Sequence, residues 1–181
     1  ATELFLRRGY EATSMNELVK AANLNRHSLY NEFVDKEGFF LACIKHYTLE
    51  ERNIKTVDIL THKPIGIKNI EMFLDDRVEY ALSDNCYGCL LVNTINERGV
   101  VSEKINQVID RITANQETLI LKCIDAAIEN KEISEKNDST ILKDYLACVV
   151  MGVMNLSKDP NKNKNSLRKM GSMALSSIIR D

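Results

Sequence analysis

Apolar residues recur every three or four positions along nearly the whole chain, and this spacing places them on one face of an α-helix. The segment 102–127 is the longest example, with Ile, Val, Leu and Cys at that spacing. The 181 residues include only seven glycines and two prolines, so few positions favour turns. No segment shows the alternation typical of a strand. We therefore predict an all-α fold with long helices.

The first 23 residues carry clear signals for where helices stop and start. Residues 2–8 have the pattern of a helix end, and Gly9 is suited to stop that helix. Ser14, with Glu17 three positions later, forms a capping box that opens the next helix. Asn23 tolerates the left-handed backbone that ends such a helix. We expect a first helix that is truncated here, with native residues before Ala1.

A second short helix follows after a three-residue turn. Leu24 is an apolar residue that we expect to face the core, and Asn25 is placed to cap a helix from Arg26 to Phe33. Leu29 and Phe33 lie four positions apart on this helix and should face inward. Two short helices joined in this way, with a preceding helix to complete the core, form a helix-turn-helix. In such a motif the second helix enters the major groove of DNA.

The outward face of this second helix is rich in groups that can hydrogen-bond to base edges and phosphates. These residues are Arg26, His27, Ser28, Tyr30 and Asn31. Thr13 and Lys36 flank the motif at helix starts, where hydroxyls, cations and free N–H groups suit phosphate. From spacing alone, the polar surface of any helical protein is an equal alternative, because short helix pairs are common.

The rest of the chain continues in helical period. We predict helices over about 35–60, 67–82, 89–97, 102–127, 138–157 and 165–180. Asp35 caps the first of these, and Asp138 or Ser139 caps the fifth. Residues 158–165 form a polar loop.

Several of these segments resemble the DNA-binding domain of the tetracycline-repressor (TetR) family. The similar stretches are Glu3-Leu4-Phe5, Arg8 to Met15, Leu18-Val19, Ala21-Ala22, Ser28 to Phe33 and Asp35-Lys36-Glu37. Gly88 to Asn93, followed by Glu97, is similar to a segment of many members' regulatory domains. The resemblance implies about nine helices, a homodimer, and repression relieved by a small molecule. It also places Thr13 and Lys36 at phosphates and residues 26–31 on the recognition helix.

This resemblance divides the chain into a DNA-binding domain over residues 1–46 and a regulatory, dimerisation domain over residues 47–181. The dimer interface should involve the helices at 138–157 and 165–180, where Gly152, Gly171 and Ala174 permit close helix approach. The alternative is that their apolar stripes complete the core of a monomer. A twofold dimer would set two recognition helices about one DNA turn apart, on a roughly palindromic operator.

The small-molecule effector is expected among the helices of the regulatory half, and its identity is not indicated. The candidate pocket residues are Tyr47, Phe73, Tyr80, Leu90, Asn93, Ile112 and Cys123. Each is more often a core residue than a pocket residue when it occurs at helical spacing.

Cysteine usage leaves a second kind of regulator open. Cys86 and Cys89 form a CxxC pair, which can bind a soft metal or form a redox disulfide. Metal binding would need further ligands, and the only histidines are His27, His46 and His62. The alternative is therefore a thiol- or metal-responsive regulator on the same scaffold, although no metal site or cofactor is expected.

Charge and composition restrict the remaining function classes. The net charge is −2, and residues 1–46 carry six basic and six acidic side chains, so any DNA binding must come from a local arrangement. No catalytic constellation stands out, so we do not expect an enzyme. Five cysteines without a secretory signal indicate a cytoplasmic protein. We expect no membrane-spanning segment, because no run of about 18 apolar residues is evident.

Overall fold

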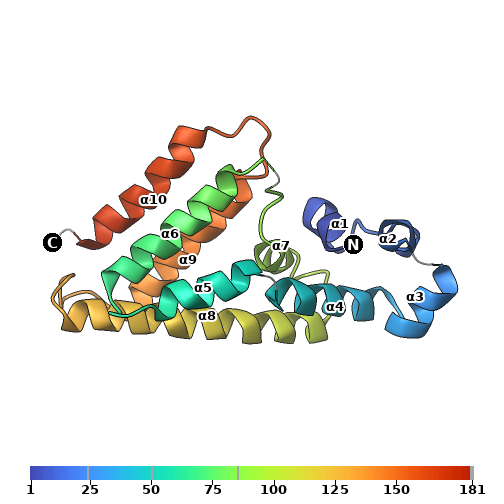
Figure 1. The fold of residues 1–181 in the computed structure, drawn as a ribbon, viewed down its shortest axis with the longest axis horizontal. Coiled ribbons are helices and arrows are strands. Elements are labelled where there is room, and N and C mark those ends of the chain that lie inside the picture. Colours follow the sequence, from blue (N-terminus) through green and yellow to red (C-terminus); the bar gives the residue numbers. More distant parts are fainter. Residues whose placement is uncertain (24, 50, 85, 180–181) are drawn as a thin grey trace. The chain divides into compact units, whose positions relative to one another are not determined.

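The computed structural model describes residues 1–23, 25–49, 51–84 and 86–179, without the side chains of residues 26, 28, 29, 51 and 52. Over these residues the secondary structure is helical and contains no strand, which confirms the predicted fold class (Figure 1). The helices are α1 (Thr2–Arg8), α2 (Met15–Ala22), α3 (Arg26–Phe33), α4 (Lys36–Leu49), α5 (Glu51–Thr61), α6 (Ile67–Leu82), α7 (Leu90–Asn96), α8 (Glu103–Glu129), α9 (Ser139–Leu156) and α10 (Lys164–Ile179).

The helix predicted over about 35–60 corresponds to α4 and α5, and the one residue between them lies outside the described residues. Whether the two segments form one helix stays a prediction. The side-chain amide of Asn53 donates to the backbone carbonyl of Tyr47.

The chain forms two compact units, which we describe separately. Unit 1 contains residues 1–53 and 87–113, and unit 2 contains residues 54–86 and 114–181. These units are defined by packing alone. The division into DNA-binding and regulatory domains at residue 46 is a functional one and stays a prediction.

Unit 1 has an aromatic core that joins the N-terminal helices to α7 and α8. Phe5 of α1 and Phe40 of α4 are almost fully buried, with ring centroids 4.6 Å apart. Leu91 of α7 and Ile105 of α8 belong to the same core. The first four helices therefore share their apolar core with α7 and α8, two later elements of the chain.

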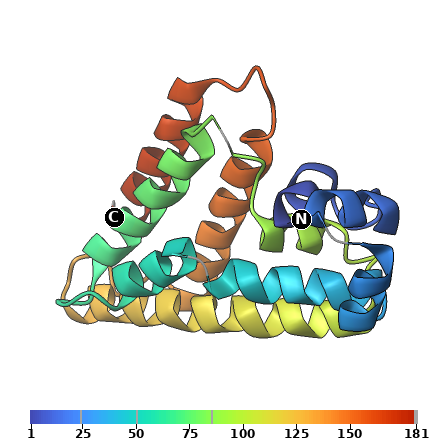
Figure 2. The ribbon, with the colours of Figure 1, turned by 45° about the vertical axis from the view of Figure 1, so that its right-hand side comes forward.

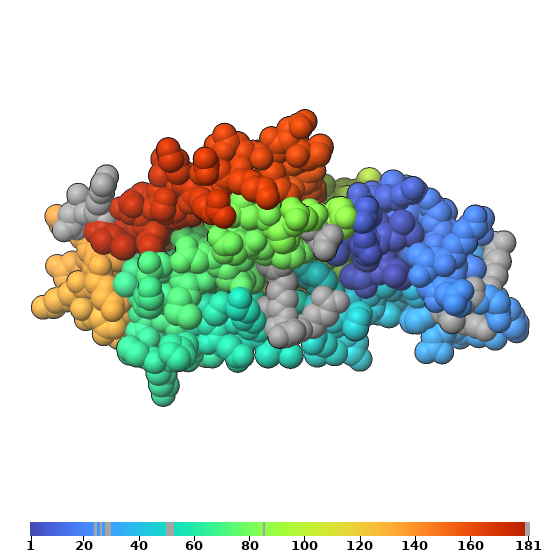
Figure 3. All heavy atoms as spheres, turned by 45° about the horizontal axis from the view of Figure 1, so that its top comes forward, coloured from blue at the N-terminus to red at the C-terminus, as the bar shows by residue number. Residues whose placement is uncertain are grey.

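Unit 2 is built around α6, α9 and α10, which pack side by side (Figure 2). The space-filling view shows α10 lying along α6 (Figure 3). The apolar core of unit 2 includes Ile70, Leu74, Ile124 and Leu146. These helices bury their apolar stripes against each other within one chain.

The close approach expected at glycines of a dimer interface occurs instead inside unit 2. A Cβ atom on Gly171 would lie 3.0 Å from Val78 Cγ2 of α6, and Ala174 is only 1 % exposed. The nearest atom to a Cβ on Gly152 would be Met170 Cε of α10, at 3.7 Å. Gly171 and Ala174 therefore serve packing within one subunit, and the dimer interface on these helices stays a prediction.

Helix α9 departs from the expectation that no segment could cross a membrane. By length and composition, Ser139–Leu156 is apolar enough to do so, with a mean hydropathy of 1.2. Such a composition is weak evidence for a membrane span. It does show that α9 exposes an apolar surface, since only 17 % of the segment is buried.

A buried ion pair lies between α5 and α6 in unit 2. Arg77 is 7 % exposed, and its Nη2 donates to Thr56 Oγ1 at 2.7 Å and to Asp76 Oδ2 at 2.6 Å. Lys55 Nζ lies 2.6 Å from the other oxygen of Asp76. Burial raises the pKa of the Asp76 carboxyl, but Lys55 and Arg77 lower it more, so that pKa lies below its usual value.

We predict that Asp76→Asn destabilises the protein by roughly 3 kcal/mol, because it leaves the Arg77 guanidinium buried without its counter-ion. Since the folded pKa of Asp76 is depressed, its contribution is present above the unfolded pKa of about 3.9 and is lost as the pH falls through the folded pKa. Urea unfolding measured at pH 7 and pH 3 checks both statements. The exposed neighbour Asp75→Asn is the control, and equal stabilities of the two variants would contradict the prediction.

Candidate nucleic-acid interface

The two-helix motif begins and turns as predicted. Ser14 and Glu17 form the capping box: Ser14 N donates to Glu17 Oε2 at 2.9 Å, and Glu17 N donates to Ser14 Oγ at 3.4 Å. These bonds with Ser14, and then the charge of Arg8, lower the pKa of the Glu17 carboxyl. Helix α2 ends at Asn23, whose φ of 52° and ψ of 38° are the expected left-handed values.

Helix α3 runs from Arg26 to Phe33, also as predicted. Phe33 is partly buried and meets Phe39 of α4 edge to face, with ring centroids 4.6 Å apart. His27, Tyr30 and Asn31 are exposed, as expected for a face that reads DNA. The predicted contacts Arg26 and Ser28, and the predicted inward positions Leu24 and Leu29, lie outside the described side chains.

Two exposed polar side chains of α3, His27 and Asn31, lie within hydrogen-bond distance of each other. Asn31 Nδ2 lies 3.3 Å from His27 Nε2, one helical turn away, so the amide can donate to the neutral ring. The amide and imidazole groups can each donate and accept hydrogen bonds, as base edges in the major groove require.

Thr13 and Lys36, the predicted phosphate contacts, are both occupied within the protein. Thr13 is 1 % exposed, and its Oγ1 donates to the carbonyl of Gly9 at 2.7 Å. Lys36 Nζ donates to the carbonyls of Tyr10 at 3.2 Å and Glu11 at 3.4 Å, and it lies 4.3 Å from the centroid of the Tyr10 ring. Both side chains hold the turn between α1 and α2, and their contact with phosphate stays a prediction.

Val34, directly after α3, has a strained backbone. Its φ is +65°, in the left-handed region that β-branched residues avoid, and its side chain is 75 % exposed. Helix α4 begins two residues after Val34. Its N-terminus is capped as predicted, because Gly38 N donates to Asp35 Oδ1 at 2.8 Å. The sharp turn after Phe33 fixes where α3 ends relative to α4.

Val34→Asn should stabilise the fold by about 1 kcal/mol, because asparagine tolerates the left-handed region and no buried contact is lost. Thermal unfolding measures the difference. The matched control is Val100→Asn, since Val100 is 57 % exposed and its φ is not positive. A gain of equal size in both variants would show that lower surface hydrophobicity, and not relief of backbone strain, is the cause.

The seven residues predicted to contact an effector are divided between the units. Tyr47, Leu90, Asn93 and Ile112 lie in unit 1, and Phe73, Tyr80 and Cys123 lie in unit 2. All are buried except Tyr80 and Ile112, which are partly buried. Burial raises the pKa of the Cys123 thiol to about 11, and its Sγ donates to the Leu60 carbonyl at 3.2 Å. Their role in effector binding stays a prediction.

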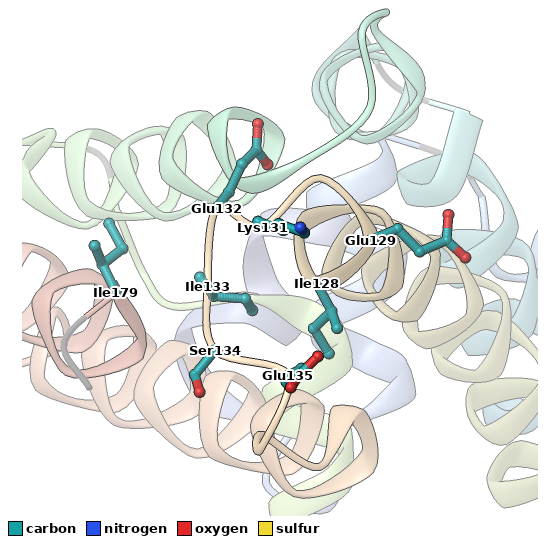
Figure 4. Close-up of a pocket in the computed structure, with 8 residues that line it drawn as sticks. All are labelled: Ile128, Glu129, Lys131, Glu132, Ile133, Ser134, Glu135 and Ile179. Atoms are coloured by element: carbon teal, nitrogen blue, oxygen red, sulfur yellow. The ribbon is translucent and has the colours of Figure 1, made fainter.

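Other residues line two surface hollows. One, of about 680 Å³, lies at the turn after α8 in unit 2 (Figure 4). Its lining residues are Ile128, Glu129, Lys131, Glu132, Ile133, Ser134, Glu135 and Ile179. Glu132 is directed toward α6, where its Oε2 accepts from Ile67 N at 2.7 Å. The other, of about 440 Å³, is in unit 1 beside α1 and α4.

The two cysteines of the CxxC pair have separate partners. Cys86 is buried with its Sγ 3.2 Å from Ser157 Oγ, and Cys89 Sγ accepts from the Tyr47 hydroxyl at 3.5 Å. Both are free thiols. Among the residues that the structure describes, no group of three or more His, Cys, Asp or Glu could hold a metal ion. These contacts are those of packed side chains, and they give the thiol- or metal-responsive alternative no added support.

The comparisons with known proteins agree with this geometry. A family model described as "Bacterial regulatory proteins, tetR family" matches residues 1–43. The chain is 29 % identical to the HTH-type transcriptional repressor ComR of Escherichia coli (strain K12), over 84 % of this chain and 73 % of that protein. The chain belongs to the TetR family. It is a DNA-binding transcriptional regulator, and the role of α3 as its recognition helix stays a prediction.

Solved structures show how far the TetR fold extends along the chain. The TetR family transcriptional regulator CifR, complexed with 26-bp double-strand operator DNA, matches with a TM-score of 0.83 at 24 % identity. That match covers 98 % of this chain and 92 % of that chain. A TetR transcriptional regulator from Chloroflexus aurantiacus J-10-FL matches with a TM-score of 0.85 at 20 % identity, over 99 % and 90 % of the two chains.

Sequence reasoning missed one contact of the helix-turn-helix segment. Glu97, noted only as part of a family-like segment, contacts the turn between α1 and α2. A local sequence pattern could not reveal this contact, because Glu97 lies 87 positions after Tyr10 and 86 positions after Glu11 in the chain.

Proposed function

We propose that this TetR-family protein is a repressor that binds a palindromic operator as a homodimer and releases it when a small molecule binds. The observation that carries the proposal is the exposed His27, Tyr30 and Asn31 face on a capped helix-turn-helix. Two proteins with related sequence or fold support it by their descriptions: ComR is a transcriptional repressor, and CifR is complexed with operator DNA. The cytoplasm is the compartment that such a role requires.

The homodimer is supported by an apolar surface on α9 and α10. Ile141 is 67 % exposed and Tyr145 is 38 % exposed, four positions apart on α9. Met173 of α10 is 67 % exposed, and Ser177 Oγ of α10 donates to the Tyr145 hydroxyl at 3.2 Å. An exposed patch of this kind marks an association surface, and an isologous contact would cover it twice. The same contact accounts for the high hydropathy of α9.

Asn31→Ala should weaken binding to the operator by about tenfold or more, because one base-reading amide is lost. The probe is a duplex selected from random sequences by the wild-type protein, and a scrambled duplex measures non-specific binding. Binding to the scrambled duplex should not change, since that binding depends on phosphate charge. The control is Asn115→Ala on an exposed part of α8.

Equal losses on both duplexes would show that α3 does not read sequence. A wild-type protein that selects no preferred duplex would contradict the proposed repressor.

Ile141→Asp should convert the dimer to a monomer, because it places a carboxylate in an apolar contact without a partner. Sedimentation at several protein concentrations measures the change. Operator affinity should fall with it, since two half-sites must be bound together. Val100→Asp, on an exposed turn of unit 1, is the control, and a dimer that survives Ile141→Asp would place the interface elsewhere.

A further inference from the structure

The carboxylate of Glu97 binds the turn that connects α1 to α2. Glu97 ends α7, and its Oε2 accepts from the backbone N–H of Tyr10 at 2.8 Å. Its Oε1 accepts from the backbone N–H of Glu11 at 3.2 Å. Both bonds are charge-assisted and are therefore stronger than bonds between neutral groups.

A cation binds the carbonyl groups of the same two residues. Lys36, in the first turn of α4, donates to the carbonyls of Tyr10 and Glu11. A carboxylate therefore satisfies the two N–H groups, and an ammonium satisfies the two carbonyls. With its polar groups fixed in this way, the turn depends on α4 and α7 as much as on its own sequence.

Gly9 permits the close approach of this carboxylate. Its φ is +82°, which glycine adopts without strain. A Cβ atom at this position would lie 2.6 Å from Glu97 Oε1, far inside van der Waals contact. Gly9 therefore has two reasons to be glycine: the end of α1 and the space that Glu97 requires.

Asn93 attaches α7 to α1 at a second point, one turn before Glu97. It is 6 % exposed, and its Nδ2 donates to the carbonyl of Leu6 at 3.1 Å and to that of Tyr87 at 3.3 Å. Leu90 and Leu91 anchor the start of α7 in the apolar core of unit 1. Helix α7 is thus fixed against the end of α1 by apolar packing, an amide and a carboxylate.

We propose that Glu97 is a positioning residue for DNA binding, which sets the turn over residues 9–13 and through it the recognition helix. The turn ends at Ser14, whose hydroxyl caps α2, and α2 leads directly to α3. Glu97 acts through the backbone and not by touching DNA, because a carboxylate repels phosphate. The proposal rests on the DNA-binding function.

Replacing Glu97 by a neutral residue distinguishes a positioning role from a purely electrostatic one, because the two roles predict opposite changes in DNA affinity. Removing a negative charge near DNA strengthens binding if charge alone matters. Glu97→Gln removes that charge and leaves one acceptor oxygen for two N–H groups. Positioning therefore predicts weaker binding, and electrostatics predicts tighter binding.

We test this with Glu97→Gln in the full chain, against the duplex selected by the wild-type protein and its scrambled form. We expect specific binding to weaken on the order of tenfold, the effect of losing one charge-assisted hydrogen bond, with non-specific binding unchanged or slightly tighter. Glu103→Gln, an exposed glutamate of unit 1 with the same change of charge, is the control and should not weaken binding. Unchanged or tighter specific binding by Glu97→Gln overturns the proposal.

Hydrogen–deuterium exchange tests the local mechanism and does not depend on DNA. In Glu97→Gln the amides of Tyr10 and Glu11 should exchange several-fold faster, with α4 still protected. Faster exchange across α4 as well would indicate general loosening of unit 1 and would overturn the proposal. If the wild-type protein selects no duplex, the proposed function fails while this measurement still reports on the turn.

A double-mutant cycle gives a second readout. Gly9→Ala should weaken specific binding in the wild-type background, because the added methyl displaces the Glu97 carboxylate. In the Glu97→Ala background the strain of the positive φ at position 9 remains, but no carboxylate is displaced, so the same change should weaken binding less. Equal effects in the two backgrounds would show that the two positions act independently and would contradict the proposal.

Discussion

The contact between Phe5 and Phe40 is the interaction on which the short helices α2 and α3 depend. Two helices of eight residues bury too little apolar surface to be stable alone, so α2 and α3 need an external core. Phe5 and Phe40 supply it together with Leu18, which α2 contributes. Because α7 and α8 close the same core through Leu91 and Ile105, the N-terminal helices depend on packing from the later part of the chain.

Local chemistry made much of the fold predictable. The capping box at Ser14, the left-handed Asn23 and the cap at Asp35 are each written in a few consecutive residues, and each occurs as expected. Helical period likewise located α6, α8, α9 and α10 to within a few residues. The exposure of His27, Tyr30 and Asn31 on α3 follows from the same pattern, because it places Phe33 on the opposite, inward side of the helix. These features need no knowledge of what the chain packs against.

Features that depend on distant contacts were not predictable. Thr13 and Lys36 have the residue types of phosphate ligands, yet their polar groups bind backbone carbonyls in the turn before α2. Gly171 suggested contact between subunits, but its near neighbour is Val78 of the same chain.

Gly9 and Glu97 also carry a consequence for how this protein can change over generations. A larger residue at position 9 would collide with the carboxylate, and a shorter residue at position 97 would leave two backbone N–H groups in need of other partners. Neither position can drift freely while the other is kept. Selection should therefore act on these two distant positions together. It should keep glycine at position 9, where the positive φ requires it as well, and a carboxylate at position 97 while the two N–H groups have no other partner.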